Sequence, residues 1–229
     1  MSADPHAAGV LRRAGPTAAR ARLAMVMLHG RGAGAEGILP LAADIGALDI
    51  ALFAPEATGR SWWPVSFLAP MNRLQPWLGS ALSAVDRAIR TAAQEGFADG
   101  RIVLLGFSQG GCLALEYAAR SGRRLRSVFG LSAGLVGTAD DGNVPVAELY
   151  GHSPKRFEYK AGLDGVPVYI GCHERDPHIP LRRVRESEAV FRAQGADCTA
   201  SVSPGAGHGI TEQDAAALRR VLLANVGDV

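Results

Sequence analysis

The stretch "RIVLLGFSQGG", residues 101–111, joins an apolar run to a serine that lies between small residues. Continuous apolar side chains over 102–105 are typical of a strand buried on both faces of a sheet. The run stops at Gly106, and a helical pattern follows Ser108 over about 109–121. We therefore predict a strand, a sharp turn at Ser108 and a helix, which is the repeating connection of α/β folds.

The rest of the chain repeats this alternation of strands and helices. Buried parallel strands are predicted at "LAMVML" (23–28), "IALFAP" (50–55), "RIVLLG" (101–106) and "VPVYIG" (166–171), with weaker patterns at "RSVFGLS" (126–132) and "CTASVS" (198–203). Helical patterns cover about 35–48, 72–95, 109–121, 181–194 and 211–225. Thr211, followed by Asp214, is typical of a helix N-cap.

This alternation predicts an α/β fold with a mostly parallel central sheet flanked by helices on both faces. The sequence has no internal repeat and no low-complexity linker, so we expect a single domain over 1–229. Residues 1–21 are expected to be an edge strand or a flexible N-terminal segment, with an antiparallel strand at about 10–22. The Gly-, Asp- and Pro-rich segment 132–165 indicates a long loop and no large lid domain.

Composition excludes several classes of protein. With 48% hydrophobic and 20% charged residues and a net charge of +2, the 229-residue chain is typical of a soluble domain without affinity for nucleic acid or membrane surfaces. No apolar run approaches the roughly 18 residues of a membrane span. Cys112, Cys172 and Cys198 are odd in number and lack metal-ligand spacing. We expect a cytoplasmic protein with small buried cysteines and no bound metal.

Ser108 lies in the pattern G-x-S-x-G, formed with Gly106 and Gly110. The pattern is short enough to occur by chance, and one interpretation is a tight turn with a bystander serine. Its place between a predicted strand and helix favours another interpretation, a nucleophile elbow that lifts the hydroxyl above the edge of the sheet. The start of the following helix favours a developing negative charge there.

A serine hydroxyl needs a base and an orienting acid before it becomes a nucleophile. The loops "HERDPHIP" and "PGAGHGI" follow two later strands and supply Asp176 as the acid and His208 as the base. Glu174 is an alternative acid two residues away. His173 and His178 flank the acid as neighbouring or surface residues, and His6 is expected to be solvated.

Ester chemistry also needs donors for an oxyanion. The segment "HGRGAGAEG" (29–37) predicts a tight turn after the first long strand, where the backbone N–H of Arg31 can act with that of Gln109. A phosphate-binding glycine loop is the alternative, but the segment lacks the Lys-Ser/Thr of a P-loop.

An aromatic cluster lies between the second strand and the longest helix. Its members are Trp62, Trp63, Phe67, Leu68, Met71 and Trp77, interrupted by three prolines. Core packing is one interpretation. The other is a substrate-pocket wall at the carboxyl edge of the sheet, for which we predict Trp62, Trp63 and Phe67, with Phe107 beside the serine.

The segments "LHGRGAGAEGILPLA", "LLGFSQGG", "HERDPHIP" and "GAGH" together resemble the carboxylesterase/phospholipase branch of the α/β-hydrolases, which includes the acyl-protein thioesterases. The resemblance extends from about residue 22 to 225. It implies Ser108 as nucleophile, Asp176 and His208 as its partners, the Arg31 and Gln109 amides as oxyanion donors, and no cofactor. The chain has "HGRGAGAE" where the thioesterases have a pattern similar to "HGLGD", and "GRSWWPVSFLAP" is similar to bacterial esterases.

We therefore expect a serine hydrolase that cleaves small carboxylic esters through an acyl-enzyme. A thioesterase or lysophospholipase would use the same residues. A non-catalytic, ligand-binding relative of the fold is the alternative from another class, although a binding protein has no need of all three triad residues. The sequence leaves open the physiological substrate and whether the protein is a monomer or a homodimer.

Overall fold

A seven-stranded sheet with the order β1-β3-β2-β4-β5-β6-β7 lies at the centre of the structure. The structure is a computed structural model that describes residues 4–141 and 144–224. Six strands are parallel: β2 (Leu23–Leu28), β3 (Ile50–Pro55), β4 (Ile102–Phe107), β5 (Ser127–Leu131), β6 (Pro167–Arg175) and β7 (Asp197–Ala206). The short β1 (Leu11–Ala14) pairs antiparallel with β3 at one edge, within the segment 10–22.

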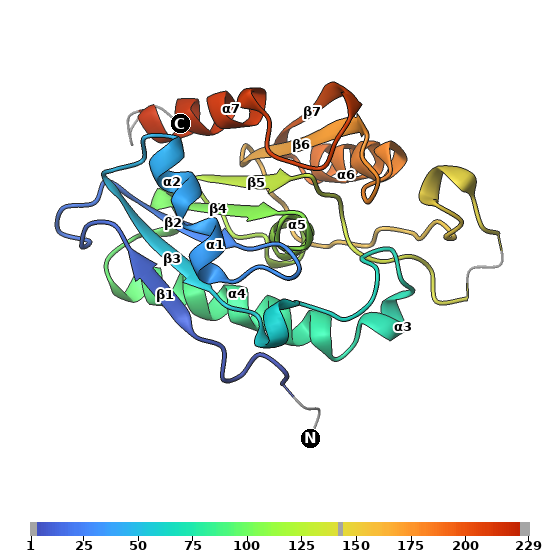
Figure 1. Ribbon diagram of the computed structural model, residues 1–229, viewed down its shortest axis with the longest axis horizontal. Helices are drawn as coiled ribbons and strands as arrows, with labels where there is room; N and C mark the ends of the chain where they lie inside the picture. The colour runs from blue at the N-terminus through green and yellow to red at the C-terminus, as the bar shows by residue number, and fades with distance from the viewer. Residues whose placement is uncertain (1–3, 142–143, 225–229) are drawn as a thin grey trace.

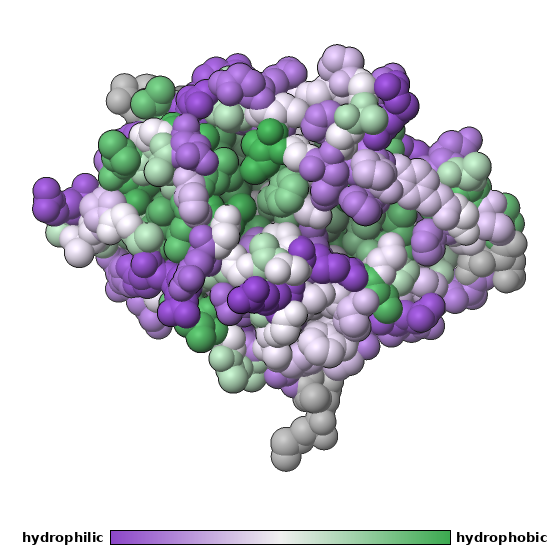
Figure 2. Space-filling view, in the orientation of Figure 1, coloured by the Kyte–Doolittle hydropathy of each residue, from purple (hydrophilic) through white to green (hydrophobic). Residues whose placement is uncertain are grey.

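Helices cover both faces of the sheet (Figure 1). One face buries α4 (Trp77–Gln94), α5 (Gln109–Ser121) and α6 (Leu181–Ala193); the other buries α1 (Ala35–Ile38), α2 (Pro40–Asp44) and α7 (Glu212–Leu223). Because successive strand residues point to opposite faces, Leu104 joins the first core and Leu105 the second. On the face seen in Figure 2, apolar residues gather in the hollowed middle and hydrophilic ones surround them.

This arrangement confirms the predicted single-domain α/β fold with a mostly parallel sheet. Both weaker strand patterns are strands, and β6 and β7 run longer than predicted, to Arg175 and Ala206. Thr211 and Asp214 form the capping box at the start of α7. None of the helices within 4–141 and 144–224 is long and apolar enough to cross a membrane.

Two of the predicted helices are interrupted. The pattern at 72–95 divides into α3 (Met71–Leu74) and α4, because Pro76 disfavours helical geometry in the residue before it and Gln75 is extended. The pattern at 35–48 divides into α1 and α2, with Pro40 at the start of the second helix. A proline is accepted in a first helical turn, where its missing N–H breaks no hydrogen bond.

The segment 132–165 is a long connection whose described part contains one short 3₁₀ turn, Ala147–Leu149, and no lid domain. Buried charged side chains hold it to the helices. The fully buried Arg183 of α6 donates to the carbonyls of Leu135 and Gly137, both at 2.7 Å. The buried Glu116 of α5 accepts hydrogen bonds from the Val136 N–H and the Tyr159 hydroxyl. These hydrogen bonds therefore hold the connection against α5 and α6, although its described part contains little regular secondary structure.

The prediction that His6 is solvated is wrong. Its ring is fully buried; Nδ1 accepts from the N–H of Thr58 at 3.1 Å and Nε2 donates to the carbonyl of Trp62 at 2.9 Å. Burial lowers the pKa of His6, which fits the neutral tautomer that these two contacts require. The N-terminal segment thus holds the loop that follows β3, a partner that lies far away in the sequence.

Candidate active site

Ser108 occupies a strained turn between β4 and α5, with φ 54° and ψ −120°. The two flanking glycines are required by close packing. A Cβ on Gly106 would lie 2.1 Å from the carbonyl oxygen of Gly110, and one on Gly110 would lie 2.2 Å from the carbonyl oxygen of Leu28. Because neither glycine carries a side chain, the helix can begin directly against β2 and β4. This places Ser108 at the carboxyl ends of these two strands.

The structure brings the three predicted catalytic side chains together. The Ser108 Oγ lies 2.9 Å from Nε2 of His208, and Nδ1 of His208 lies 2.8 Å and 3.0 Å from the two carboxylate oxygens of Asp176. Nδ1–H therefore donates to the carboxylate, which leaves Nε2 to accept the serine proton. This is the geometry of a nucleophile, its base and the acid that orients the base.

Asp176 is fully enclosed and extensively hydrogen-bonded. Burial opposes ionisation of its carboxyl group, but the hydrogen bond from His208 and those from the N–H groups of His178 and Ile179 outweigh burial and lower its pKa. The carboxylate is thus ionised at neutral pH. Glu174, the alternative acid, has an exposed side chain that pairs with Arg175 at 3.0 Å and makes no contact with His208.

Two hydrogen bonds that the sequence did not predict hold the loops that carry Asp176 and His208. The Ser132 hydroxyl, at the end of β5, donates to the carbonyl of Gly209 at 3.0 Å, beside His208. The Tyr150 hydroxyl donates to the backbone carbonyl of Asp176 at 2.5 Å. Neither residue lies near a motif, so no signal in the sequence pointed to them.

The predicted oxyanion donors border the same site. A Cβ on Gly30 would lie 3.4 Å from the Ser108 Cβ, so the turn that carries Arg31 passes directly beside the serine. Within residues 4–141 and 144–224, the backbone N–H groups of Arg31 and Gln109 donate to no protein group. The buried His29 ring donates from Nδ1 to the carbonyl of Gly30 at 2.8 Å and holds the turn in place.

A cleft of about 640 Å³ opens over the serine. Its lining comprises Gly30, Arg31, Ala33, Ser66, Phe67, Phe107, Ser108, Gln109, Cys112, His178, Ile179 and His208. Phe67 and Phe107, which the sequence analysis assigns to a substrate pocket, thus lie in the lining of this cleft. Phe107 and His178 also contact the His208 ring, with ring centroids 5.3 Å and 4.8 Å from it. Within the described part of the chain, no three His, Cys, Asp or Glu residues are grouped to hold a metal ion.

The prediction that Trp62 and Trp63 line the pocket is wrong. Both are fully buried in the core on the α4 and α5 face and are absent from the cleft lining. The Trp62 indole N–H donates to the carbonyl of His29 at 2.9 Å, and its ring stacks on the His29 ring. The Gln109 side chain holds the backbone of both tryptophans, accepting from the Trp62 N–H and donating to the Trp63 carbonyl. These contacts turn the indoles inward.

Trp63→Ala is expected to destabilise the fold by about 3–5 kcal/mol, because it leaves a large cavity in the core. Thermal unfolding measures the loss. Trp63→Phe is the control: it keeps a ring and removes an indole N–H that has no hydrogen-bond partner among the described residues, so we expect a much smaller effect. A stable Trp63→Ala with an altered choice of acyl chain would contradict the core assignment.

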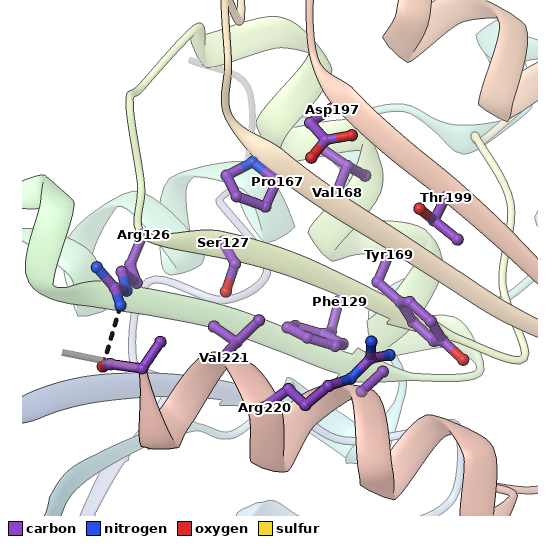
Figure 3. A pocket seen from close by; sticks show the side chains of 12 residues that line it. Arg126, Ser127, Phe129, Pro167, Val168, Tyr169, Asp197, Thr199, Arg220 and Val221 are labelled. Atoms are coloured by element: carbon purple, nitrogen blue, oxygen red, sulfur yellow. Dashed lines mark hydrogen bonds between the residues drawn. The ribbon is translucent and has the colours of Figure 1, made fainter. Parts of the chain in front are cut away.

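A second hollow, of about 300 Å³, lies between α7 and the strands β5, β6 and β7 (Figure 3). Its lining includes Ser127, Pro167 and Asp197, the first residues of those three strands. It is therefore at the amino ends of parallel strands, opposite to the edge that carries Ser108. No histidine lines it, so its lining has no counterpart of the base that stands beside Ser108 in the first cleft.

The elbow, the strand order and the loops after β6 and β7 define an α/β-hydrolase. Residues 16–225 match the family model described as Phospholipase/Carboxylesterase, and the chain belongs to that family of ester hydrolases. A phospholipase/carboxylesterase from Dyadobacter fermentans DSM 18053 has a similar structure, with a TM-score of 0.82 and 32% identity, covering 94% of this chain and 97% of that one.

More distant structures share the fold. The carboxylesterase of Bacillus cereus has a TM-score of 0.70 at 16% identity, with 94% of each chain covered. Esterase PE8 has a TM-score of 0.69 at 20% identity, covering 93% of this chain and 97% of that one.

Proposed function

We propose that the protein is a serine carboxylesterase that cleaves small carboxylic esters through an acyl-enzyme, without a cofactor. The observation that carries the proposal is the hydrogen-bonded chain from Ser108 through His208 to Asp176 at the floor of an open cleft. A protein that only bound a ligand would have no need of a strained serine placed against a base that is itself oriented by a buried carboxylate.

In the first half-reaction, the Ser108 oxygen attacks the ester carbonyl carbon while His208 Nε2 takes the hydroxyl proton. The Asp176 carboxylate keeps the remaining ring proton on Nδ1 and stabilises the imidazolium that forms. The carbonyl oxygen becomes an oxyanion, for which the unpaired N–H groups of Arg31 and Gln109 are the donors. When the tetrahedral intermediate collapses, the alkoxide leaves and takes the proton from Nε2.

In the second half-reaction, water replaces the alcohol. His208 removes a proton from the water as its oxygen attacks the acyl carbon of the Ser108 ester. The same two amides stabilise the second oxyanion, and its collapse returns the proton from Nε2 to Ser108 and releases the carboxylic acid. A thioester or lysophospholipid would follow the same steps, so the walls of the cleft decide among these substrates.

These walls favour short or aromatic acyl groups. Phe67, Phe107 and Ile179 contribute rigid apolar surface close to the serine, and Phe67 is only 8% exposed. Such a cleft accepts a few methylenes and leaves the remainder of a long chain in solvent. Each methylene that an apolar pocket accommodates contributes about 1 kcal/mol to discrimination.

A series of p-nitrophenyl esters from acetate to palmitate tests this function. We expect kcat/KM to be highest at about hexanoate or shorter acyl chains and to decline for longer ones, because the cleft accepts only a few methylenes. Each methylene that it accommodates contributes about 1 kcal/mol, which corresponds to about fivefold in rate. Phe67→Ala should move the optimum towards longer chains because it removes a wall of the cleft. A wild-type optimum at palmitate would contradict the small-ester proposal and favour a lysophospholipase.

A further inference from the structure

The side chain of Arg31 spans the mouth of the catalytic cleft. Its guanidinium donates to the carbonyls of Pro64, at 3.4 Å, and Val65, on the loop that carries Ser66 and Phe67. A guanidinium has five N–H donors, so two such bonds anchor it and leave donors for another acceptor. The cation therefore has a defined position between two walls of the cleft, while the residue remains exposed.

The charge of this guanidinium is not neutralised by the protein. Its two anchors are uncharged carbonyls, and within residues 4–141 and 144–224 Arg31 forms no ion pair with a carboxylate. Asp176, whose carboxylate pairs with His208, is buried and is absent from the lining of the cleft. Among the residues that line the cleft, Arg31 is the sole permanently charged one. The cleft is thus a cationic site with apolar walls.

The same residue also fixes where the charge lies relative to the reaction. Its backbone N–H is a proposed oxyanion donor, and the turn that carries this group passes beside Ser108. The amide and the guanidinium are separated by one arginine side chain. When the carbonyl oxygen of an ester points at the amide, the acyl and alcohol groups of that ester therefore lie within about this distance of the guanidinium. Arginine binds carboxylates through paired, charge-assisted hydrogen bonds, which discriminate a carboxylate from an uncharged amide of the same shape.

We propose that Arg31 is a specificity-determining residue that selects esters carrying a carboxylate a few bonds from the scissile carbonyl. The inference rests on the proposed esterase function and adds the chemical class of its substrates. The carboxylate lies on either side of the ester bond: in the acyl part, as in a half-ester of a dicarboxylic acid, or in the alcohol part, as in an acylated hydroxy acid.

Two matched substrate pairs test the proposal, with acid release followed in a pH-stat. The first pair is monoethyl glutarate and the ethyl ester of glutaramic acid, which replaces the carboxylate by an uncharged amide of the same shape. The second pair, 4-acetoxybutanoate and 4-acetoxybutanamide, puts the same change on the alcohol side. In the wild type we expect kcat/KM for the charged member of one pair to exceed that of its amide by about tenfold, and the ratio to fall as salt screens the charge.

Variants then assign the preference to Arg31. Arg31→Gln should bring the charged-to-neutral ratio close to one, and Arg31→Lys should keep part of it; the ratio is independent of any effect that the substitutions have on the oxyanion turn. Arg90→Gln is the control, since it removes an equal charge from an exposed site on α4 outside the cleft, and it should keep the wild-type ratio.

The outcomes separate this inference from the proposed function. A ratio near one for both pairs in the wild type, or a preference that survives in Arg31→Gln, would overturn the selection of carboxylates while leaving the esterase intact. Absence of turnover with all four esters and with the p-nitrophenyl series would instead overturn the proposed function.

Discussion

Ser108→Ala is expected to lower kcat by a factor on the order of 10³ or more while the protein remains folded. Alanine removes the only atom that forms the acyl bond, and the Ser108 backbone that turns between β4 and α5 stays in place. The measurement is turnover of a short p-nitrophenyl ester, together with thermal unfolding. A fluorophosphonate probe should label the wild type at Ser108 and leave the variant unmodified.

Ser127→Ala is the matched control for this experiment. Ser127 is another buried serine and is the first residue of the apolar strand β5, but it lies at the hollow between α7 and the sheet. Its hydroxyl has no partner among the described residues. Its loss should change neither turnover nor labelling. Retention of a tenth of wild-type activity in Ser108→Ala would end the assignment of Ser108 as the nucleophile. Failure of the folded wild type to react with the probe would favour a non-catalytic protein.

Asp176→Asn is expected to lower kcat by about 10³–10⁴-fold. The carboxylate accepts from the N–H groups of His178 and Ile179 through Oδ1 and from His208 through both oxygens. In asparagine, the amide oxygen will satisfy the two backbone donors, so that the NH₂ group faces the imidazole. Nδ1 must then accept a hydrogen bond, and the ring proton moves to Nε2, where the base can no longer take a proton from Ser108.

Glu174→Gln makes the same chemical change two residues away and provides the comparison. Its side chain is exposed and pairs with the neighbouring Arg175, so we expect kcat within about twofold of the wild type, as for most exposed ion pairs. The two variants are compared in the same ester assay, with unfolding temperatures measured in parallel. The opposite ranking of the two effects would transfer the role of the acid to Glu174.

The order of elements was predictable because buried parallel strands and amphipathic helices leave patterns within a few residues. The runs at 23–28, 50–55 and 101–106 are strands β2, β3 and β4, with only small changes at their ends. The chain order of Ser108, Asp176 and His208 was equally legible, since each lies in a loop at the carboxyl end of a strand. In a parallel sheet such ends meet at one edge, even when the residues are about a hundred positions apart in the sequence.

The loop after β3 was not predictable in the same way. An indole is equally suited to a core and to a pocket wall, and nothing near Trp62 or Trp63 in the sequence distinguishes these two positions. The choice depends on the backbone carbonyl and ring of His29, which follows β2, and on the side chain of Gln109 at the start of α5. His6 is buried for the same kind of reason, because its partners are backbone groups of that loop.

The sequence by itself therefore determined the fold class, the strand–turn–helix at Ser108 and the identity of the residues that meet at the sheet edge. Those features follow from local periodicity, from glycines where no side chain fits, and from the geometry common to parallel sheets. Only the tertiary structure decided the pairing of His208 with Asp176 instead of Glu174, the burial of the tryptophans and the place of the Arg31 guanidinium over the cleft. Each of these depends on contacts between segments distant in the chain, whose free energies are set by packing that no local pattern encodes.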